Sequence, residues 1–179
     1  MIFTPTDLPG VIIVSPEPSR DERGTFSRLF CPDEFDAAGI KFQSTQVNLS
    51  TNRARHTLRG LHFQHAPYAE AKLVRCIEGS VWDVALDLRA GPTFGKWQAF
   101  QLDAASMDAV FLPEGIAHGF LTLADNSTLL YQMGRSFVPG HSAGVRWDDP
   151  DLNIDWPASP SVISQNDREL PLFKDVCFE

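Results

Sequence analysis

The feature that most limits the fold of this chain is a series of short apolar segments separated by Gly, Pro, Asn and Asp. Segments of this kind lie at 57–64, 110–113, 118–123 and 127–133. Short strands at regular spacing, with turn residues between them, are typical of a β-sandwich or a barrel. The repeating strand–helix pattern that a Rossmann fold requires is missing from the sequence. The pattern therefore predicts an all-β protein.

Two other segments support this prediction. Residues 42–50 alternate, and the two faces would consist of Phe42, Gln46 and Asn48 on one side and Val47 and Leu49 on the other. Residues 72–89 indicate a hairpin that turns at Glu78, Gly79 and Ser80. The second half of that hairpin would present one apolar face, formed by Trp82, Val84, Leu86 and Leu88.

The regions outside the strands hold one expected helix and one long loop. A short helix is expected at 32–38, because Pro32 suits a first helical turn, acidic residues follow it and Gly39 can end it. Residues 147–173 are rich in Pro and Asp, yet they carry apolar side chains that need burial, namely Trp147, Ile154, Trp156 and Ile163. We expect an ordered loop wrapped on the barrel, with a free tail as the alternative.

Length, charge and cysteine usage limit the class of protein. The chain has 179 residues and a net charge of −8, so we expect a single domain over 1–179. The charge argues against nucleic acid as the main partner, although a pocket can still be locally basic. Three cysteines without a CxxC pair predict reduced thiols at Cys31, Cys76 and Cys177. Because no basic leader and no apolar run of membrane-spanning length is present, we expect a soluble, cytoplasmic protein without a membrane partner.

The densest group of polar residues that could do chemistry lies on the segment 57–64, which carries Arg59, His62 and Gln64. A regular strand would place Arg59 and His62 on opposite faces. Gly60 lies between them and can form a bulge that turns both side chains inward. Taken alone, a histidine on a strand is more often structural than catalytic.

A second motif, at 113–120, has the form Pro-x-Gly-x-x-His and includes His118. This is the shape of the second cupin motif, in which a tight turn precedes a histidine that points into a small barrel. The first motif of a metal-binding cupin needs two histidines one residue apart. Here Gln64 takes the place of the second histidine, and His65 is shifted to the other face. We therefore expect no metal, and no other cofactor motif is present.

Three further polar residues each allow two interpretations. Lys72 opens an apolar strand, where it could reach the cavity as a fixed cation or lie exposed at the strand end. Tyr131 shares a strand face with Leu129 and Met133 and could be a core residue or a proton donor. Asp167 lies in a polar loop, where it could be solvated or could orient a histidine.

Together these motifs resemble the dTDP-4-dehydrorhamnose 3,5-epimerase family. The combination of LRGLH, KLVRC and PEGIAHGF is specific to that family. The resemblance covers nearly the whole chain, through DERGTF (21–26), QVNLS (46–50), LRGLHFQ (58–64), AKLVRCIEGSVWDVALDLR (71–89), GPTFGKW (91–97), LPEGIAHGF (112–120), LLYQM (129–133) and GVRWDDPDLNIDWP (144–157). It implies an all-β, cupin-like jelly-roll barrel (a double-stranded β-helix) with short peripheral helices, and an isomerase that needs no cofactor.

The resemblance also implies a role for each matching residue. His62 would be the general base, paired with Asp167, and Tyr131 would be the acid on the opposite face of the sugar ring. Lys72 would stabilise the enolate oxygen. The pocket for the nucleotide-sugar substrate would be completed by Arg59, Gln46, Asn48 and His118. Arg23 and Phe26 lie in the N-terminal arm, residues 1–30, which in the family's homodimer reaches into the neighbouring subunit's site.

The implied reaction inverts carbon 3, carbon 5 or both in a nucleotide-linked 4-keto-6-deoxy sugar, as in the conversion of dTDP-4-dehydro-6-deoxyglucose to dTDP-4-dehydrorhamnose. Two substrate-binding positions differ from the family pattern. Arg28 stands where better-known members have Glu, and Phe137 stands where many members have a second Tyr. The nucleotide base and the number of inverted carbons therefore stay open. The alternatives are a single-carbon epimerase of a GDP- or CDP-linked sugar, a sugar-nucleotide ketoisomerase, a metal-dependent cupin oxygenase and a non-catalytic sugar-binding barrel.

Overall fold

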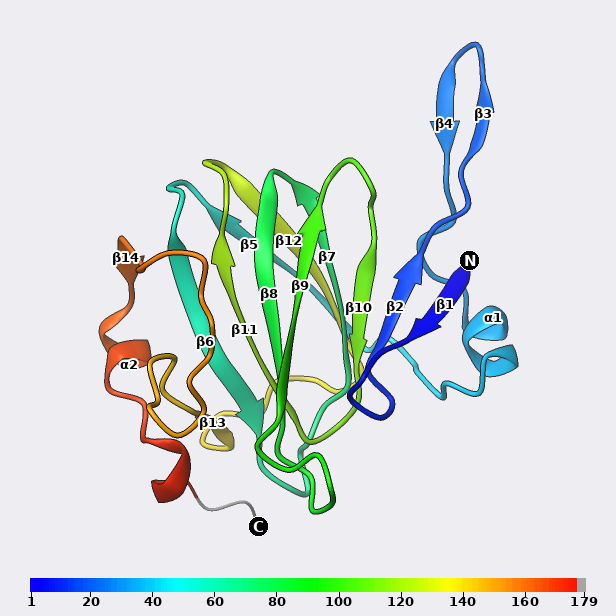
Figure 1. Ribbon diagram of the computed structural model, residues 1–179. Helices are drawn as coiled ribbons and strands as arrows, with labels where there is room; N and C mark the ends of the chain where they lie inside the picture. Colours follow the sequence, from blue (N-terminus) through cyan, green and yellow to red (C-terminus); the bar gives the residue numbers. More distant parts are fainter. Residues whose placement is uncertain (177–179) are drawn as a thin grey trace.

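The computed structural model describes residues 1–176, which form two antiparallel sheets that face each other (Figure 1). In spatial order, sheet 1 contains β1 (Ile2–Pro5), β2 (Ile12–Ser15), β10 (Ala109–Leu112), β7 (Lys72–Glu78), β12 (Ser127–Met133) and β5 (Gln46–Asn52). Sheet 2 contains β13 (Ser142–Gly144), β6 (Thr57–Gln64), β11 (Ile116–Thr122), β8 (Ser80–Asp87) and β9 (Trp97–Asp103), and β14 (Val162–Ile163) pairs with β6 in parallel. The predicted cupin-like barrel is confirmed.

The remaining elements lie around the barrel. They are the β3–β4 hairpin (Ser19–Asp21 and Gly24–Phe26), helix α1 (Pro32–Ala37), helix α2 (Gln165–Arg168) and the 3₁₀ turn η1 (Phe173–Asp175). Helix α1 begins at Pro32 and ends one residue before the predicted boundary, with Gly39 at a φ of +78° just beyond it. Within residues 1–176, the helices are all too short and too polar to cross a membrane. The predicted cytoplasmic location stays a prediction.

Apolar side chains fill the space between the sheets and also cover part of each outer face. Val74 and Leu129 of sheet 1 meet Val81 and Phe120 of sheet 2 inside the barrel. Outside sheet 1, α1 contributes Phe35 to a cluster of aromatic rings. Outside sheet 2, the segment after β13 covers a third cluster that includes Leu86, Leu152 and Trp156. The central strands are therefore buried on both faces, which explains their long apolar sequences.

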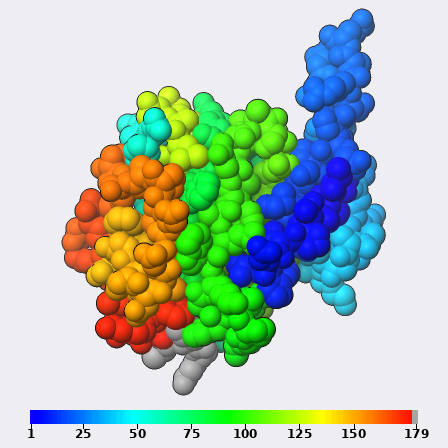
Figure 2. Space-filling view, in the orientation of Figure 1, coloured from blue at the N-terminus to red at the C-terminus, as the bar shows by residue number. Residues whose placement is uncertain are grey.

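The C-terminal segment is an ordered covering of the barrel rather than a tail. Ile154 and Trp156 pack on the outer cluster of sheet 2, and the Trp156 indole donates a hydrogen bond to the Trp147 carbonyl at 2.9 Å. Trp147 and Ile163 are half-buried as well. In Figure 2 this segment, coloured orange to red, lies against one side of the barrel. The expected wrapping of residues 147–173 is therefore confirmed for the part of the chain described.

The predicted hairpin at 72–89 is wrong, although its turn exists. β7 pairs with β10 and β12 in sheet 1, whereas β8 pairs with β9 and β11 in sheet 2. At Gly79, which has a φ of +73°, the chain crosses from one sheet to the other. A turn signal fixes where the chain bends but not whether the flanking strands hydrogen-bond to each other. The predicted apolar face of β8 is real, and it points outward beneath the C-terminal segment.

The strand predicted at 42–50 begins later than expected, at Gln46, and continues to Asn52. Phe42 precedes the strand and packs in the aromatic cluster outside sheet 1. Val47 and Leu49 are 59% and 64% exposed, because β5 is an edge strand whose outer face has no covering element in the described chain. The sequence pattern did not predict seven of the strands, namely β1, β2, β3, β4, β9, β13 and β14.

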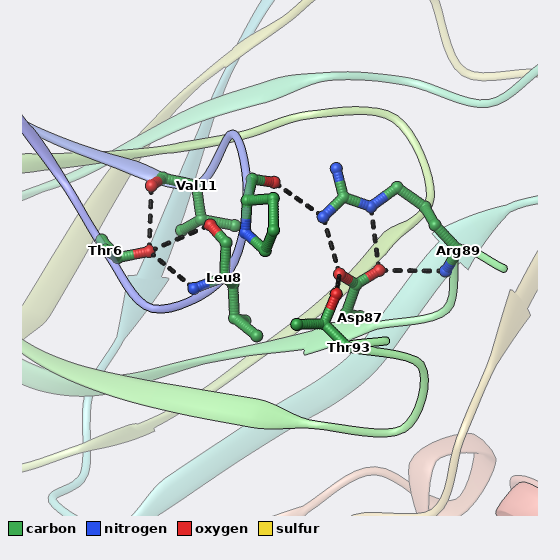
Figure 3. Close-up of polar contacts among 7 residues, drawn as sticks. Thr6, Leu8, Val11, Asp87, Arg89 and Thr93 are labelled. Carbon is green, nitrogen blue, oxygen red and sulfur yellow. Dashed lines mark hydrogen bonds and ion pairs between the residues drawn. The ribbon is translucent and has the colours of Figure 1, made fainter. Parts of the chain in front are cut away.

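A polar anchor fastens the N-terminal strands to the barrel (Figure 3). Arg89 donates to both carboxylate oxygens of Asp87 at 2.8 and 2.6 Å, and it also donates to the Pro9 carbonyl at 2.7 Å. Thr93 donates to the same Asp87 carboxylate at 2.8 Å. Burial would raise the pKa of Asp87, but these donors outweigh it and lower the pKa. The turn between β1 and β2 is thereby fixed against the end of β8.

Candidate active site

A bulge in β6 places two of the predicted site residues on one side of the strand. His118 of β11 stands opposite His62, and Phe120 stands opposite Arg59, so β6 has one extra residue in this interval. Gly60 has a φ of +108°, and a Cβ there would lie 2.7 Å from both the Gly119 Cα and the His118 carbonyl oxygen. Only glycine fits this position. The predicted bulge at Gly60 is confirmed, and Arg59 and His62 line the same pocket.

That pocket has a volume of about 280 Å³ and lies between the two sheets. Sheet 1 contributes Asn48, Leu49, Ser50, Lys72, Tyr131 and Met133, and sheet 2 contributes Arg59, His62, His118 and Phe120. Six residues predicted for the site therefore share one cavity. Its wall combines cationic, hydrogen-bonding and apolar groups, a mixture that suits a phosphorylated sugar ligand.

His62 is held by a carboxylate from the C-terminal segment. Asp167 Oδ1 lies 2.6 Å from His62 Nε2. Asp167 is positioned by the start of α2, where its amide donates to Ser164 Oγ at 3.0 Å as an N-cap. Burial would raise the pKa of Asp167, but His62, Ser164 and the Gly60 amide outweigh it and lower the pKa. Asp167 is therefore ionised at neutral pH and fixes the orientation of the imidazole ring.

Tyr131 lies across the pocket and faces a second histidine–carboxylate pair. Its ring is in an edge-on contact with His118, with centroids 5.7 Å apart. His118 Nε2 lies 2.7 Å from Asp83 Oδ2, and both of these side chains are buried. Burial and the charge of Asp83 raise the pKa of Tyr131 well above its ordinary value, while Arg59 opposes the shift. Tyr131 thus stays protonated at neutral pH and can donate a proton.

Lys72 and Arg59 bring positive charge to the same pocket, and each has a fixed partner. Lys72 Nζ lies 3.2 Å from Glu70 Oε1 and donates to the His62 carbonyl at 3.1 Å. Burial lowers the pKa of Lys72, and the charge of Glu70 opposes this effect. Arg59 donates to Asn52 Oδ1 at 2.9 Å through Nε. Its two terminal nitrogens, Nη1 and Nη2, take no part in that bond. A terminal guanidinium of this kind suits two phosphate oxygens.

Two other predicted residues lie just outside this wall. Gln46 donates to Asn48 Oδ1 at 3.0 Å and accepts a hydrogen bond from the Phe137 amide at 3.2 Å. The Phe137 ring itself is 57% exposed. Both residues are therefore connected to the pocket through Asn48 rather than lining it.

The arm residues are not brought to this pocket within the chain. Arg23 and Phe26 lie on the β3–β4 hairpin, which stands out from the body in Figure 2, and Phe26 is 80% exposed. Arg23 forms an ion pair with Asp21 of the same hairpin. Arg28 instead contacts α1, where its Nη1 lies 2.7 Å from Glu34 Oε1.

Sequence reasoning missed the partners of the pocket residues, namely Asp83, Glu70 and Asn52. Asp83 shares the inward face of β8 with the buried residues Val81 and Ala85. An acidic residue on an otherwise apolar strand face is the one sequence signal that could have indicated it. Gln64, which stands where a metal-binding cupin has histidine, donates a hydrogen bond to Glu70. Over residues 1–176, no group of three or more His, Cys, Asp or Glu side chains is placed to hold a metal ion. Cys31 and Cys76 are free thiols, and Cys177 lies outside the described residues.

Facing antiparallel sheets, with a pocket between them whose histidine is held by a carboxylate, define a cupin-like barrel with a candidate site for proton transfer. Comparison with known families narrows this class. The family model described as dTDP-4-dehydrorhamnose 3,5-epimerase matches residues 5–175. The chain therefore belongs to the dTDP-4-dehydrorhamnose 3,5-epimerase family, and it is a carbohydrate epimerase.

Individual relatives agree with this assignment. The chain is 40% identical over 173 residues to a dTDP-4-dehydrorhamnose 3,5-epimerase of Shigella flexneri, covering 96% of this chain and 95% of that one. It is 39% identical over 178 residues to a dTDP-4-dehydrorhamnose 3-epimerase of Streptomyces niveus, covering 98% and 86%. The crystal structure of the Bacillus anthracis dTDP-4-dehydrorhamnose 3,5-epimerase with TDP and PPi bound has a TM-score of 0.93 at 33% identity, covering 96% and 98%.

Proposed function

We propose that this chain inverts carbon 3, carbon 5 or both in a dTDP-linked 4-keto-6-deoxy sugar, with dTDP-4-dehydro-6-deoxyglucose as substrate. The observation that carries the proposal is that His62 and Tyr131 line one pocket from opposite sheets. Inversion needs a base on one face of the sugar ring and an acid on the other. The TDP bound to the Bacillus anthracis relative supports the choice of nucleotide.

In the proposed mechanism, His62 removes the proton from a carbon next to the ketone. Asp167 accepts the Nε2–H of the neutral ring, so Nδ1 carries the lone pair that acts as the base. The carbanion electrons move onto the ketone oxygen and form an enolate. Asp167 stabilises the imidazolium that results.

The second half-reaction returns a proton from the other side. Tyr131 donates its phenol proton to the same carbon as the enolate collapses back to the ketone, and the centre is inverted. His62 then releases its proton and Tyr131 regains one from solvent, which restores the resting enzyme. The Lys72 ammonium stabilises the enolate oxygen, and Arg59 binds the diphosphate.

We further propose a homodimer in which the arm of one copy, residues 1–30, completes the pocket of the other. An 80% exposed Phe26 on a projecting hairpin supports this proposal, since a phenyl ring in water favours a partner surface. The exposed apolar side chains of Val47 and Leu49 on the edge of sheet 1 offer such a surface.

Inversion of a single carbon is the narrower form of this proposal. It is favoured by the similarity to the Streptomyces niveus 3-epimerase and by Phe137, which has no hydroxyl group to hold an intermediate. NMR of the product formed from dTDP-4-dehydro-6-deoxyglucose tests the proposals about the reaction. Inversion at one carbon or both supports epimerisation. A carbonyl moved to carbon 3 would indicate a ketoisomerase, and unchanged dTDP-sugar would refute the proposed substrate.

A further inference from the structure

The buried ion pair of Lys72 and Glu70 contains a carboxylate to which the proposed mechanism gives no role. Glu70 lies in the connection between β6 and β7, and its side chain is 7% exposed, against 6% for Lys72. One carboxylate oxygen, Oε1, lies 3.2 Å from Lys72 Nζ. The other oxygen, Oε2, accepts a hydrogen bond from Gln64 Nε2. Both oxygens are therefore occupied, and the carboxylate is held in one orientation.

Gln64 links this carboxylate to the rest of the site wall. Its amide nitrogen also donates to the Tyr68 carbonyl at 3.2 Å, and its amide oxygen accepts from the Val138 amide at 2.9 Å. Val138 follows Phe137 directly. The Gln64 side chain, itself 5% exposed, thus fixes Glu70 on one side and the loop that carries Phe137 on the other.

The geometry at Lys72 leaves one donor for the substrate. An ammonium group has three N–H donors. One is directed to Glu70 and one to the His62 carbonyl at 3.1 Å, and within residues 1–176 no third acceptor lies at Nζ. Because Lys72 lines the pocket, its third N–H can meet a substrate oxygen there.

Such a donor is most effective when the nitrogen is charged, and burial works against that charge. A fully buried lysine without a partner can have a pKa as low as about 5–6. Burial lowers the pKa of Lys72, while the charge and hydrogen bond of Glu70, and more weakly the charge of Asp83 on β8, raise it. The other titratable groups that face the pocket are Arg59 and His62 on β6, His118 on β11 and Tyr131 on β12. Among all these groups, Glu70 is the carboxylate in direct contact with Nζ.

We propose that Glu70 is a positioning residue that keeps the Lys72 amine charged and directs its free N–H into the pocket, with Gln64 holding Glu70 in place. This inference rests on the proposed function, in which Lys72 stabilises the enolate oxygen. Glu70 does not touch the sugar and acts through Lys72. Its loss is therefore expected to slow proton abstraction and to leave substrate binding nearly unchanged.

The direct test is an NMR titration of the lysine side chains. The chain has four lysines, Lys41, Lys72, Lys96 and Lys174, so the Lys72 signal is assigned by its loss in Lys72→Met. In Glu70→Gln, the Lys72 pKa is expected to fall by about 1–3 pH units, the effect of an opposite charge within about 4–6 Å. Glu70→Asp, which keeps the charge, should retain most of the wild-type value. Glu114→Gln removes an equal charge from the exposed β10–β11 turn and should change nothing.

Kinetics provide the second readout. In Glu70→Gln, kcat should fall at least tenfold at pH 8, while KM changes less than threefold. The alkaline limb of the kcat–pH profile should shift to lower pH, following the lowered pKa of Lys72. The double variant Glu70→Gln/Lys72→Met should be no slower than Lys72→Met alone, because Glu70 acts through Lys72. An unchanged Lys72 titration in folded Glu70→Gln overturns the inference, whatever the activity. Full activity of Lys72→Met would instead refute the role that the proposed function gives to Lys72.

Discussion

Replacing Asp167 by Asn tests the histidine–carboxylate pair with the smallest change of shape. Asp167 Oδ1 lies 2.6 Å from His62 Nε2, and a hydrogen bond to a charged group contributes about 1.5–3 kcal/mol. Because the His62 side chain is 44% exposed, water screens the pair, and we take the lower end of that range. A loss of about 1.5 kcal/mol corresponds to roughly a tenfold lower rate.

The larger effect comes from the tautomer of His62. The Asp167 carboxylate also accepts a hydrogen bond from the Gly60 amide. The side chain of the Asp167→Asn variant has only one oxygen, and we expect that oxygen to stay with the Gly60 amide. Its NH₂ group would then face Nε2 and drive the ring proton onto Nδ1, the atom needed as the base. The tautomer and the lost bond together should lower kcat by roughly 10²–10⁴-fold.

The assay is turnover of dTDP-4-dehydro-6-deoxyglucose by the purified variant, with Asp151→Asn, an exposed Asp in the C-terminal segment, as the matched control. Stability gives an independent readout. Because the folded-state pKa of Asp167 is lowered, the pair stabilises the fold above the unfolded Asp pKa, about 3.9, and this stability is lost as the pH falls through the folded-state pKa. The free-energy difference between wild type and Asp167→Asn should therefore shrink below about pH 4. A folded variant with kcat within threefold of wild type would refute the reasoning.

Four further predictions test other parts of the site. Tyr131→Phe should still exchange the substrate proton with solvent through His62 but should fail to invert the carbon, which NMR in deuterium oxide separates. Mixing Arg23→Ala with His62→Ala protein under subunit exchange should restore part of the activity; proven exchange without recovery would contradict a shared site. Phe137→Tyr should change the ratio of exchange at carbons 3 and 5 several-fold, because one neutral hydrogen bond contributes about 0.5–1.5 kcal/mol; equal, unaltered rates would mean that Phe137 only packs. Exhaustive chelation should leave activity intact, and loss that a single metal reverses would argue for a metal-dependent reaction.

Local sequence patterns were sufficient for the strands that carry the reacting groups. β6 and β12 have the predicted bounds, and the bulge at Gly60 follows from a glycine between two polar residues that must face one way. The short helix at Pro32 was equally predictable, since its start and end residues are local signals. These features depend on neighbours in the sequence, which is why one sequence is enough to find them.

Long-range pairing set the limit of that reasoning. The turn at Gly79 looks like a hairpin, and only the pairing of β7 with β10 and β12 shows that the chain changes sheet there. The contact between Asp83 and His118 depends on the register of β8 against β11. Glu70 lies in a connection without any periodic pattern, so nothing in the sequence predicted that it would meet Lys72.

Deuterium incorporation tests the central claim most directly. Wild-type protein, incubated with dTDP-4-dehydro-6-deoxyglucose in deuterium oxide, should place solvent deuterium on a carbon next to the ketone and invert that carbon. His62→Ala should incorporate no label above the uncatalysed rate while it still binds dTDP, as judged by a raised melting temperature. Label incorporation by folded His62→Ala at the wild-type rate would contradict the assignment of His62 as the base.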